Sequence, residues 1–233
     1  MEINIASFQN TLIIIPVYNG ANELPELLLR IRSTAPLSNI LCINDGSIDH
    51  SCEIMKENHL QYLSWEKNRG KGYALKKGLQ FAKKSGYKFA LSIDADLQHD
   101  PKIIPRFLIT QNKEQADLVI GFRKFSWKNM PWLRVLSNTI TSYILSKLLN
   151  NNILDSQSGY RLYNLKLFWQ KEISTDQYQM ETEILLEYTK KGAKLAFVEI
   201  PVLYHKEISH IAHGRDVVNF CKLICQKMGR RNW

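Results

Sequence analysis

The chain has 233 residues, of which 45% are hydrophobic, and a formal net charge of +9 from 31 basic and 22 acidic residues. This length suits one α/β domain, and the hydrophobic content excludes a disordered chain. The longest strongly apolar run, Thr11–Val17, is far shorter than the ~20 residues of a membrane-spanning helix.

The positive charge favours an anionic partner, and no basic run or helix-turn-helix pattern points to nucleic acid. The start of the chain lacks the basic residues of a signal peptide. Its four cysteines form no C-x-x-C pair, which is typical of free thiols in a reducing compartment. We therefore expect a cytoplasmic protein without a nucleic-acid partner.

The first half alternates short apolar runs with helical stretches, the pattern of βαβ units around a parallel sheet. The predicted strands are Thr11–Pro16, Ile40–Ile43, Gln61–Trp65, Phe89–Ile93 and Asp117–Ile120. The predicted helices between them are Glu23–Ser33, Asp49–Asn58, Lys71–Lys84 and Lys102–Gln111. The less regular second half predicts helices at Met130–Leu149, Gln179–Lys190 and Asp216–Met228, and a strand at Leu195–Ile200. Without a repeat or linker, we expect a single α/β domain over residues 1–215, followed by an amphipathic helix and basic tail over 216–233.

Polar clusters follow three of the predicted strands: Pro16-Val17-Tyr18-Asn19, Asn44-Asp45-Gly46-Ser47 and Asp94-Ala95-Asp96-Leu97-Gln98. In parallel sheets, ligands bind beyond the carboxyl ends of the strands. The three clusters therefore predict a ligand site at one edge of the sheet.

The third cluster is the strongest local pattern. Asp94 and Asp96 can both reach a hard divalent cation, Mg²⁺ or Mn²⁺, and Gln98 can add a carbonyl oxygen. The alternative is a polar strand end that leads into the helix beginning near Asp100-Pro101.

Two further segments suit a nucleotide. Asp45 is either a turn residue or an unpaired carboxylate for a ribose hydroxyl or a base N–H. Arg69-Gly70-Lys71 opens a helix, where backbone can approach a ligand closely and the helix N-terminus favours an anion. The alternative for this segment is an ordinary loop.

Together and in this order, these motifs resemble those of the family 2 glycosyltransferases with a GT-A fold, over about residues 11–215. Within that family they are most similar to the dolichyl-phosphate mannose synthase and polyprenyl-phosphate glycosyltransferase branch. The matching segments are Ile15–Asn19, Asn44–Asp49, Asn68–Gly72, Asp94–Pro101, Gly121–Arg123, Ser156–Arg161 and Glu199–Val202.

The resemblance implies a Rossmann-like, mostly parallel sheet flanked by helices. It also implies a metal-dependent, inverting transfer of a sugar from a UDP- or GDP-linked donor to a polyprenyl or dolichyl phosphate. With no membrane span, the protein would meet this acceptor as a peripheral protein at the inner membrane face, or through a membrane partner protein.

The resemblance also assigns roles to residues. The donor-binding residues would be Pro16, Tyr18, Asn19, Asp45, Arg69, Gly70, Lys71 and Asp94. The metal ligands would be Asp94, Asp96 and Gln98. The acceptor would meet Arg123, Arg134, Gln157, Ser158, Arg161 and Arg215, although His205–His210 departs from the family's Gly-x-Ser-Lys pattern before Arg215. The catalytic residues would be Asp96, Arg123, Arg134 and Glu181.

Helical spacing places Glu181 at the centre of an apolar arc, with Glu183 and Glu187 pointing away from it. A carboxylate among apolar side chains is costly unless paired, so Glu181 either faces the cleft or pairs with an arginine. For Asp155 and Arg161, cleft lining and structural pairing are both open. We expect a surface or loop role for His99.

Two other functions remain open. One is transfer to a saccharide or protein hydroxyl, which needs a carboxylate base such as Glu181. The other is a non-catalytic nucleotide-sugar-binding protein, against which the intact Asp94-x-Asp96 pattern argues. The C-terminal helix and the stretch from Trp127 to Leu148 suit either a membrane interface or packing on the domain.

Overall fold

The computed structural model describes residues 8–124, 132–169, 173, 175, 179–201, 220, 223 and 224, without the side chains of residues 132–134. The strands are β1 (Thr11–Val17), β2 (Ile40–Asp45), β3 (Gln61–Trp65), β4 (Phe89–Ser92), β5 (Leu118–Arg123), β6 (Arg161–Asn164) and β7 (Leu195–Ile200). The α-helices are α2 (Leu24–Arg32), α3 (Ser51–Glu57), α4 (Lys71–Lys84), α5 (Ile104–Glu114), α6 (Trp132–Leu149) and α7 (Gln179–Lys190). Two short 3₁₀ turns, η1 (Leu37–Asn39) and η2 (Pro101–Ile103), precede β2 and α5.

The described strands form one seven-stranded sheet in the order β3-β2-β1-β4-β6-β5-β7. Neighbouring strands from β3 to β4 are parallel, as are β5 and β7, whereas β6 is antiparallel to both β4 and β5. This is the predicted Rossmann-like, mostly parallel sheet in a single domain. Because consecutive parallel strands end at the same edge, the loops after β1, β2 and β4 lie together.

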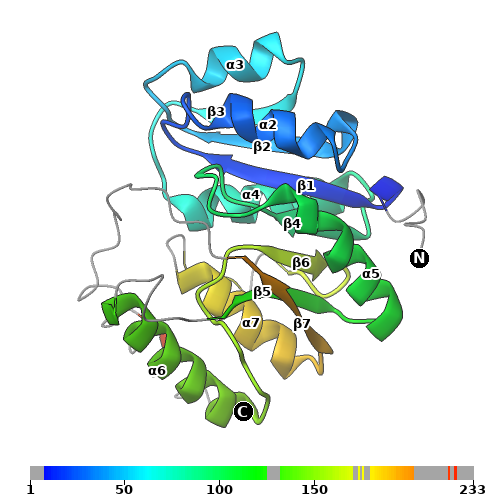
Figure 1. Cartoon of the computed structure of the whole chain (residues 1–233), viewed down its shortest axis with the longest axis vertical. Helices are drawn as coiled ribbons and strands as arrows, with labels where there is room; N and C mark the ends of the chain where they lie inside the picture. The colour runs from blue at the N-terminus through cyan, green and yellow to red at the C-terminus, as the bar shows by residue number, and fades with distance from the viewer. Residues whose placement is uncertain are drawn as a thin grey trace.

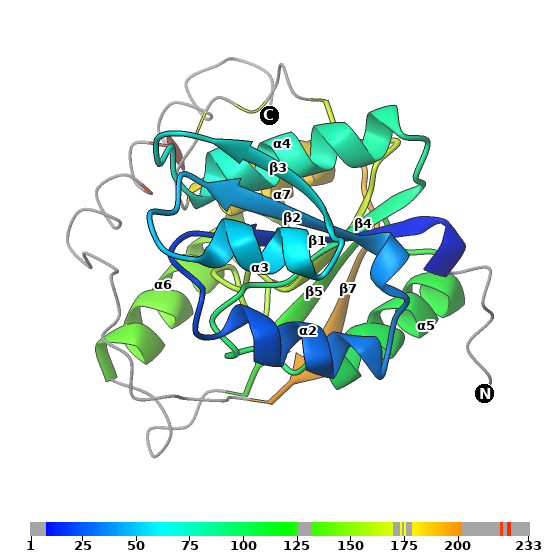
Figure 2. The ribbon, with the colours of Figure 1, turned by 90° about the horizontal axis from the view of Figure 1, so that it is seen from above.

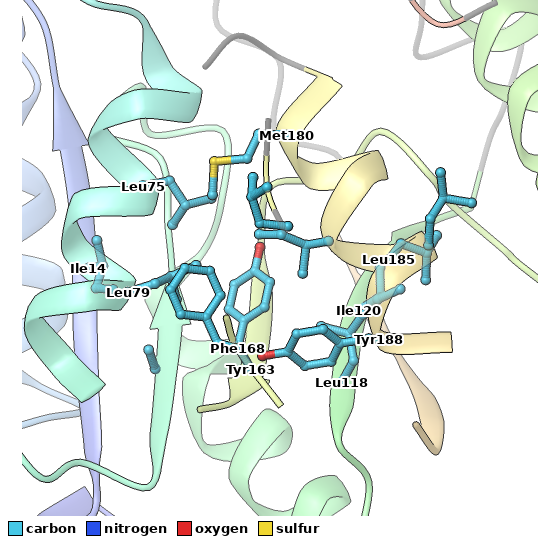
Figure 3. Close-up of a cluster of buried hydrophobic side chains, with 14 of the residues drawn as sticks. Ile14, Leu75, Leu79, Leu118, Ile120, Tyr163, Phe168, Met180, Leu185 and Tyr188 are labelled. Carbon is cyan, nitrogen blue, oxygen red and sulfur yellow. The ribbon is translucent and has the colours of Figure 1, made fainter. Parts of the chain in front are cut away.

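Helices cover both faces of the sheet (Figures 1 and 2). In β1, Leu12 and Ile14 face a core formed with α4 and α7, whereas Ile13 and Ile15 face a core formed with α2, α3 and α5. Figure 3 shows the first core, where Leu75 and Leu79 of α4 lie across from Met180 and Leu185 of α7. Because both faces of β1 are buried, its residues are apolar on both sides, as in other covered parallel sheets.

Strand β6 was not predicted. It is short, begins with a charged residue, and owes its place to pairing: Arg161 lies opposite Ser92 of β4 and Ile120 of β5. The other predicted elements agree within a few residues, although η2 precedes α5 and Asp100 Oδ1 accepts a hydrogen bond from Lys102 N at 3.0 Å.

Most of the predicted helix at 216–228 lies outside the described residues, as does Arg215. Of that segment, Phe220, Leu223 and Ile224 are described, and they are buried in the core shared with α4 and α7.

Helix α6 lies at the periphery of the molecule (Figure 1) and has an unusual distribution of side chains. Asn138, Thr141 and Ser142 face inward and are buried. On the outer side, four large apolar side chains are exposed: Leu136, Ile140, Tyr143 and Ile144. Within the part of the chain that the structure describes, no helix is both long enough and apolar enough to cross a bilayer.

Candidate active site at the carboxyl edge of the sheet

The first two polar clusters are joined by hydrogen bonds at the carboxyl edge of the sheet. Asn19 N donates to Ser47 Oγ at 2.9 Å, and Asn19 Oδ1 accepts from Ile48 N at 2.9 Å. Asn19 has a positive φ of 52°, which turns the chain away from β1 toward the loop after β2. Tyr18 beside it is 53% exposed and remains available to a ligand, whereas Pro16 lies within β1.

Asp45, at the end of β2, already has several partners. Its carboxylate accepts hydrogen bonds from Trp65 Nε1 at 2.5 Å, Arg69 N at 2.9 Å and Gly70 N at 2.8 Å. It is therefore not the unpaired carboxylate that the sequence suggested. Two of its hydrogen bonds fix the backbone just before Lys71, so any effect of Asp45 on a nucleotide includes the placement of that loop.

Glycine is required beside this loop. Gly46 has a φ of +71°, and a Cβ there would lie 2.5 Å from Asn68 N. Because only glycine tolerates both conditions, the Asp45-Gly46 turn lets the two loops touch.

The loop after β3 ends at Lys71, the first residue of α4, and Lys71 contacts the loop after β4. Its Nζ lies 2.8 Å from Oδ1 and 2.9 Å from Oδ2 of Asp94, and 3.2 Å from Oε1 of Glu181 on α7. Of the two alternatives for Glu181, facing the cleft or pairing with an arginine, the structure shows pairing, but with a lysine. Lys71 thus joins Asp94 of the first half of the chain to Glu181 of the second half.

Gly159 covers this cluster. A Cβ at Gly159 would lie 2.6 Å from Lys71 Nζ, 2.8 Å from Glu181 Oε1 and 3.0 Å from Asp94 Oδ2. Ser92 Oγ holds the same residue by donating to Gly159 O at 2.5 Å. A side chain at position 159 would displace the charged groups, a requirement that the sequence pattern alone did not reveal.

The pKa values of Asp94 and Asp96 are shifted in opposite directions. Burial disfavours the charged form of Asp94, but the Lys71 ammonium outweighs it and holds the pKa of Asp94 well below its usual range. Burial also opposes the charge of Lys71, yet Asp94 and Glu181 raise its pKa above the ordinary lysine value. For Asp96, burial and then the charge of Asp94 raise the pKa. Among the described residues, Asp94 therefore has an ion pair with a cation of the protein, and Asp96 has none.

This imbalance suits a divalent cation at Asp96. Asp96 Oδ1 accepts a hydrogen bond from Gln98 N at 3.0 Å, which folds the loop around the carboxylate. Among the described residues, no three Asp, Glu, His or Cys side chains are arranged to enclose a metal. Mg²⁺ usually binds one or two carboxylates and completes its shell with waters and substrate phosphates. The residues present, Asp96 with Asp94 and Gln98, fit an ion of that kind.

His99 was expected in a surface or loop role, and it lies in the loop after β4 but is buried there. It is 7% exposed, its ring packs on Tyr160 with centroids 5.0 Å apart, and its Nε2 lies 3.6 Å from Asp94 Oδ2. Its position five residues after Asp94 brings it back under the loop because Leu97 adopts a positive φ of 59°. Local spacing did not indicate this return.

Arg123 pairs with the fully buried Asp155. Nε and Nη2 of the guanidinium donate to Oδ2 and Oδ1 of Asp155 at 2.8 and 3.1 Å. Asn138 Nδ2 on α6 donates to the same carboxylate at 2.9 Å. Of the two roles considered for Asp155, structural pairing is the one observed, and it ties β5 and α6 together.

Arg161, expected at the acceptor, is fully buried. Its guanidinium donates to the carbonyl oxygens of Ser156, Ser158 and Glu181, each at 2.7 Å. An acceptor phosphate has no access to it in this structure, so its role is to hold the turn and the start of α7 together.

The remaining acceptor candidates differ in exposure. Gln157 is exposed and donates to Ser137 Oγ at 3.1 Å, whereas Ser158 is buried. Arg134 belongs to α6, but its side chain lies outside the described part, as does the whole of Arg215. Helical spacing predicted that Glu183 points away from the apolar arc of α7, but it is fully buried and accepts hydrogen bonds from Thr175 N and Oγ1 at 2.8 and 2.7 Å.

Comparisons with known proteins agree with this geometry. The family model of glycosyl transferase family 2 matches residues 12–170. The polyprenol monophosphomannose synthase of Mycolicibacterium smegmatis is 30% identical, over 84% of this chain and 77% of that protein. The UDP-N-acetylglucosamine–dolichyl-phosphate N-acetylglucosaminyltransferase of Methanococcus voltae is 28% identical, over 94% of this chain and 96% of that protein.

A solved structure shares the fold. Glucosyl-3-phosphoglycerate synthase of Mycobacterium tuberculosis, crystallised with Mn²⁺, UDP and glucosyl-3-phosphoglycerate, superimposes with a TM-score of 0.73 at 18% identity. The superposition covers 95% of this chain and 82% of that one. The chain therefore belongs to glycosyl transferase family 2 and is a glycosyltransferase with a GT-A fold.

Proposed function

We propose that this glycosyltransferase moves a sugar from a UDP- or GDP-linked donor to a polyprenyl phosphate, with inversion and with a divalent metal. The observation that carries the proposal is the meeting of Lys71, Asp94 and Asp96 at the carboxyl edge of the sheet. Relatives that cover most of this chain are named as enzymes of polyprenol or dolichyl phosphate.

The residues that bind the donor are assigned from the negative charge of its diphosphate. A diphosphate needs cations, and the loop fixed by Asp45 presents the N-terminus of α4 together with the Lys71 ammonium. Asp96, with Asp94 and Gln98, holds Mg²⁺ or Mn²⁺, which supplies charge stabilisation to the leaving diphosphate. Tyr18, Asn19 and Arg69 lie on the adjoining loops and contact the nucleoside.

The residues that bind the acceptor are assigned from the chemistry of a lipid phosphate and the exposed apolar side of α6. A phosphate is already an anion, so it needs no general base, only positioning and charge screening. Arg134, Gln157 and Arg215 provide these contacts, and Arg123 contributes while paired with Asp155. Gln157 is tied to α6 through Ser137, and the exposed apolar side of that helix contacts the lipid.

We place the enzyme as a peripheral protein at the inner membrane face, with α6 against the bilayer. Apart from its exposed apolar side, α6 contains basic residues and no aspartate or glutamate, and the chain carries a net charge of +9. Both features favour an anionic lipid surface.

The observed place of Glu181 speaks against a hydroxyl acceptor. Such an acceptor needs a carboxylate base with access to its proton. Glu181 Oε1 is buried beneath Gly159 and beside the Lys71 ammonium.

The test is a transfer assay with radiolabelled UDP- and GDP-sugars. Polyprenyl phosphate and free saccharides are offered as acceptors, with Mn²⁺, Mg²⁺ or a chelator. We expect label on the lipid only, with metal present, and loss of at least two orders of magnitude for Asp96→Asn. Label on a saccharide alone, or full activity in excess chelator, contradicts the lipid or the metal part of the proposal, respectively.

A further inference from the structure

The charges around Lys71 pose a problem for a metal enzyme. The ammonium contacts both oxygens of Asp94 at 2.8 and 2.9 Å, so it neutralises one of the two carboxylates of the motif. A divalent cation binds more weakly as the negative charge beside it falls. A lysine placed for the donor diphosphate therefore weakens the metal site that the same diphosphate needs.

Glu181 provides a second carboxylate at the same ammonium. Its Oε1 lies 3.2 Å from Lys71 Nζ, and its side chain is 8% exposed. Oε1 accepts no hydrogen bond among the described residues, so its contact with Lys71 is one of charge rather than of aligned hydrogen bonding. The carboxylates of Asp94, Asp96 and Glu181 and the ammonium of Lys71 together carry a net charge of −2.

In the described part of the chain, two other charged side chains lie near this cluster, but neither balances the charge of the Lys71 ammonium. Arg161 approaches Glu181 but donates to its backbone carbonyl oxygen at 2.7 Å, not to its carboxylate. His99 contacts Asp94 from another side, with Nε2 3.6 Å from Oδ2. Lys71, Asp94 and Glu181 all lie close to Gly159, where an added Cβ would collide with all three.

We propose that Glu181 is a charge-balancing, positioning residue: by sharing the Lys71 ammonium with Asp94, it keeps enough negative charge at Asp94-x-Asp96 for a divalent metal to bind beside a lysine. This inference rests on the proposed metal-dependent function. It replaces the role of general base considered for Glu181, because the residue acts on the metal site through Lys71.

The test measures Mn²⁺ affinity, from the paramagnetic resonance signal of the free ion, at saturating UDP or GDP. The variants are Glu181→Gln, Lys71→Met and the double variant, with Glu183→Gln as matched control. Glu183 is a second buried glutamate of the same helix, but its described hydrogen bonds are to Thr175. Melting temperatures establish that each variant is folded.

If Glu181 acts through charge, the Mn²⁺ affinities of the variants follow the net charge of the cluster, which a purely structural role does not predict. Glu181→Gln leaves the cluster at −1, and Mn²⁺ affinity falls about tenfold, or ~1.4 kcal/mol. Lys71→Met leaves it at −3, and Mn²⁺ affinity rises by a similar factor. The double variant returns the charge to −2 and the affinity to within about threefold of wild type, as does Glu183→Gln, which leaves the cluster unchanged.

The affinity for the nucleoside diphosphate is a second readout, and in Glu181→Gln it should not fall with the Mn²⁺ affinity. In excess chelator, Glu181→Gln should bind the nucleoside diphosphate at least as tightly as wild type, because a negative charge has been removed near an anion. Disruption of the site would weaken metal and nucleotide together. If Lys71→Met does not fold, Glu181→Gln decides the matter through these two affinities.

Three results overturn the inference. They are an unchanged Mn²⁺ affinity in Glu181→Gln, a fall in both affinities, or a fall in turnover alone, which marks a general base. Wild-type protein that binds the nucleotide but no Mn²⁺ contradicts the proposed metal dependence instead.

Discussion

The pair of Arg123 and Asp155 allows a quantitative prediction. Asp155 is fully buried, and Arg123→Ala leaves its carboxylate with hydrogen bonds from Asn138 Nδ2, Gln157 N and the backbone N of residue 123, but without an ion pair to any other described residue. Breaking a buried ion pair from one side costs ~3–5 kcal/mol. The Arg123 side chain is 16% exposed, so some water replaces it, and we take about 3 kcal/mol. At ~2–4 °C per kcal/mol for a chain of this size, Arg123→Ala should melt about 6–12 °C below wild type.

Removing both charges should cost less than removing one. In Arg123→Gln with Asp155→Asn, no uncompensated charge remains and the amides can still hydrogen-bond, so we expect recovery of more than half of the lost melting temperature. Thermal unfolding of wild type, Arg123→Ala and the double variant, followed by circular dichroism, measures this. Equal melting temperatures for Arg123→Ala and the double variant would refute the argument that the buried carboxylate needs its partner.

The same double variant separates the two roles of Arg123. If the guanidinium also meets the acceptor phosphate, transfer to polyprenyl phosphate stays slow in the stabilised double variant, by roughly 30- to 1,000-fold for a lost donor worth ~2–4 kcal/mol. Recovery of transfer together with stability assigns Arg123 to structure alone.

Three further predictions follow from other parts of the molecule. Asp45→Ala removes three hydrogen bonds of ~1 kcal/mol each and frees the loop before α4, so calorimetry should show weaker binding of the nucleoside diphosphate; an unaltered dissociation constant in a folded variant contradicts this. Ile140→Asp or Tyr143→Asp should reduce co-sedimentation with anionic vesicles about tenfold or more without lowering the melting temperature, and equal sedimentation would exclude α6 as the contact. Burial raises the pKa of the Cys42 thiol to about 12, so iodoacetamide at pH 8 should alkylate the half-buried Cys52 first and Cys42 only on unfolding; early labelling of Cys42 would count against its burial.

Much of the fold was predictable because apolar runs and helical spacing are local. Gln61–Trp65, Lys71–Lys84 and Gln179–Lys190 have the predicted bounds, and the polar residues after β1, β2 and β4 share one edge as expected. Strand β6 was missed because neighbours distant in sequence, not its own pattern, make it a strand.

The site was predictable in its residue types but not in its pairings. Position along the chain indicated that Asp94, Asp96 and Lys71 belong to the site. It did not show that Lys71 contacts Glu181 across 110 positions, that Arg161 is buried, or that His99 turns back to Asp94. These outcomes depend on which charged groups the packed helices and strands bring within about 4 Å, and burial then forces each of them to find a partner.

The insertion of β6 between β4 and β5 has a consequence for the order of assembly during synthesis. When residues up to Arg123 have left the ribosome, β4 has one unpaired edge and β5 has two, because β6, which joins them, comes some forty residues later and β7 later still. Open strand edges bind other chains, so nascent chains at this length are exposed to aggregation. Fragments that stop before Arg161 should therefore be insoluble, whereas those that include Asn164 can close the seam between the two halves of the sheet.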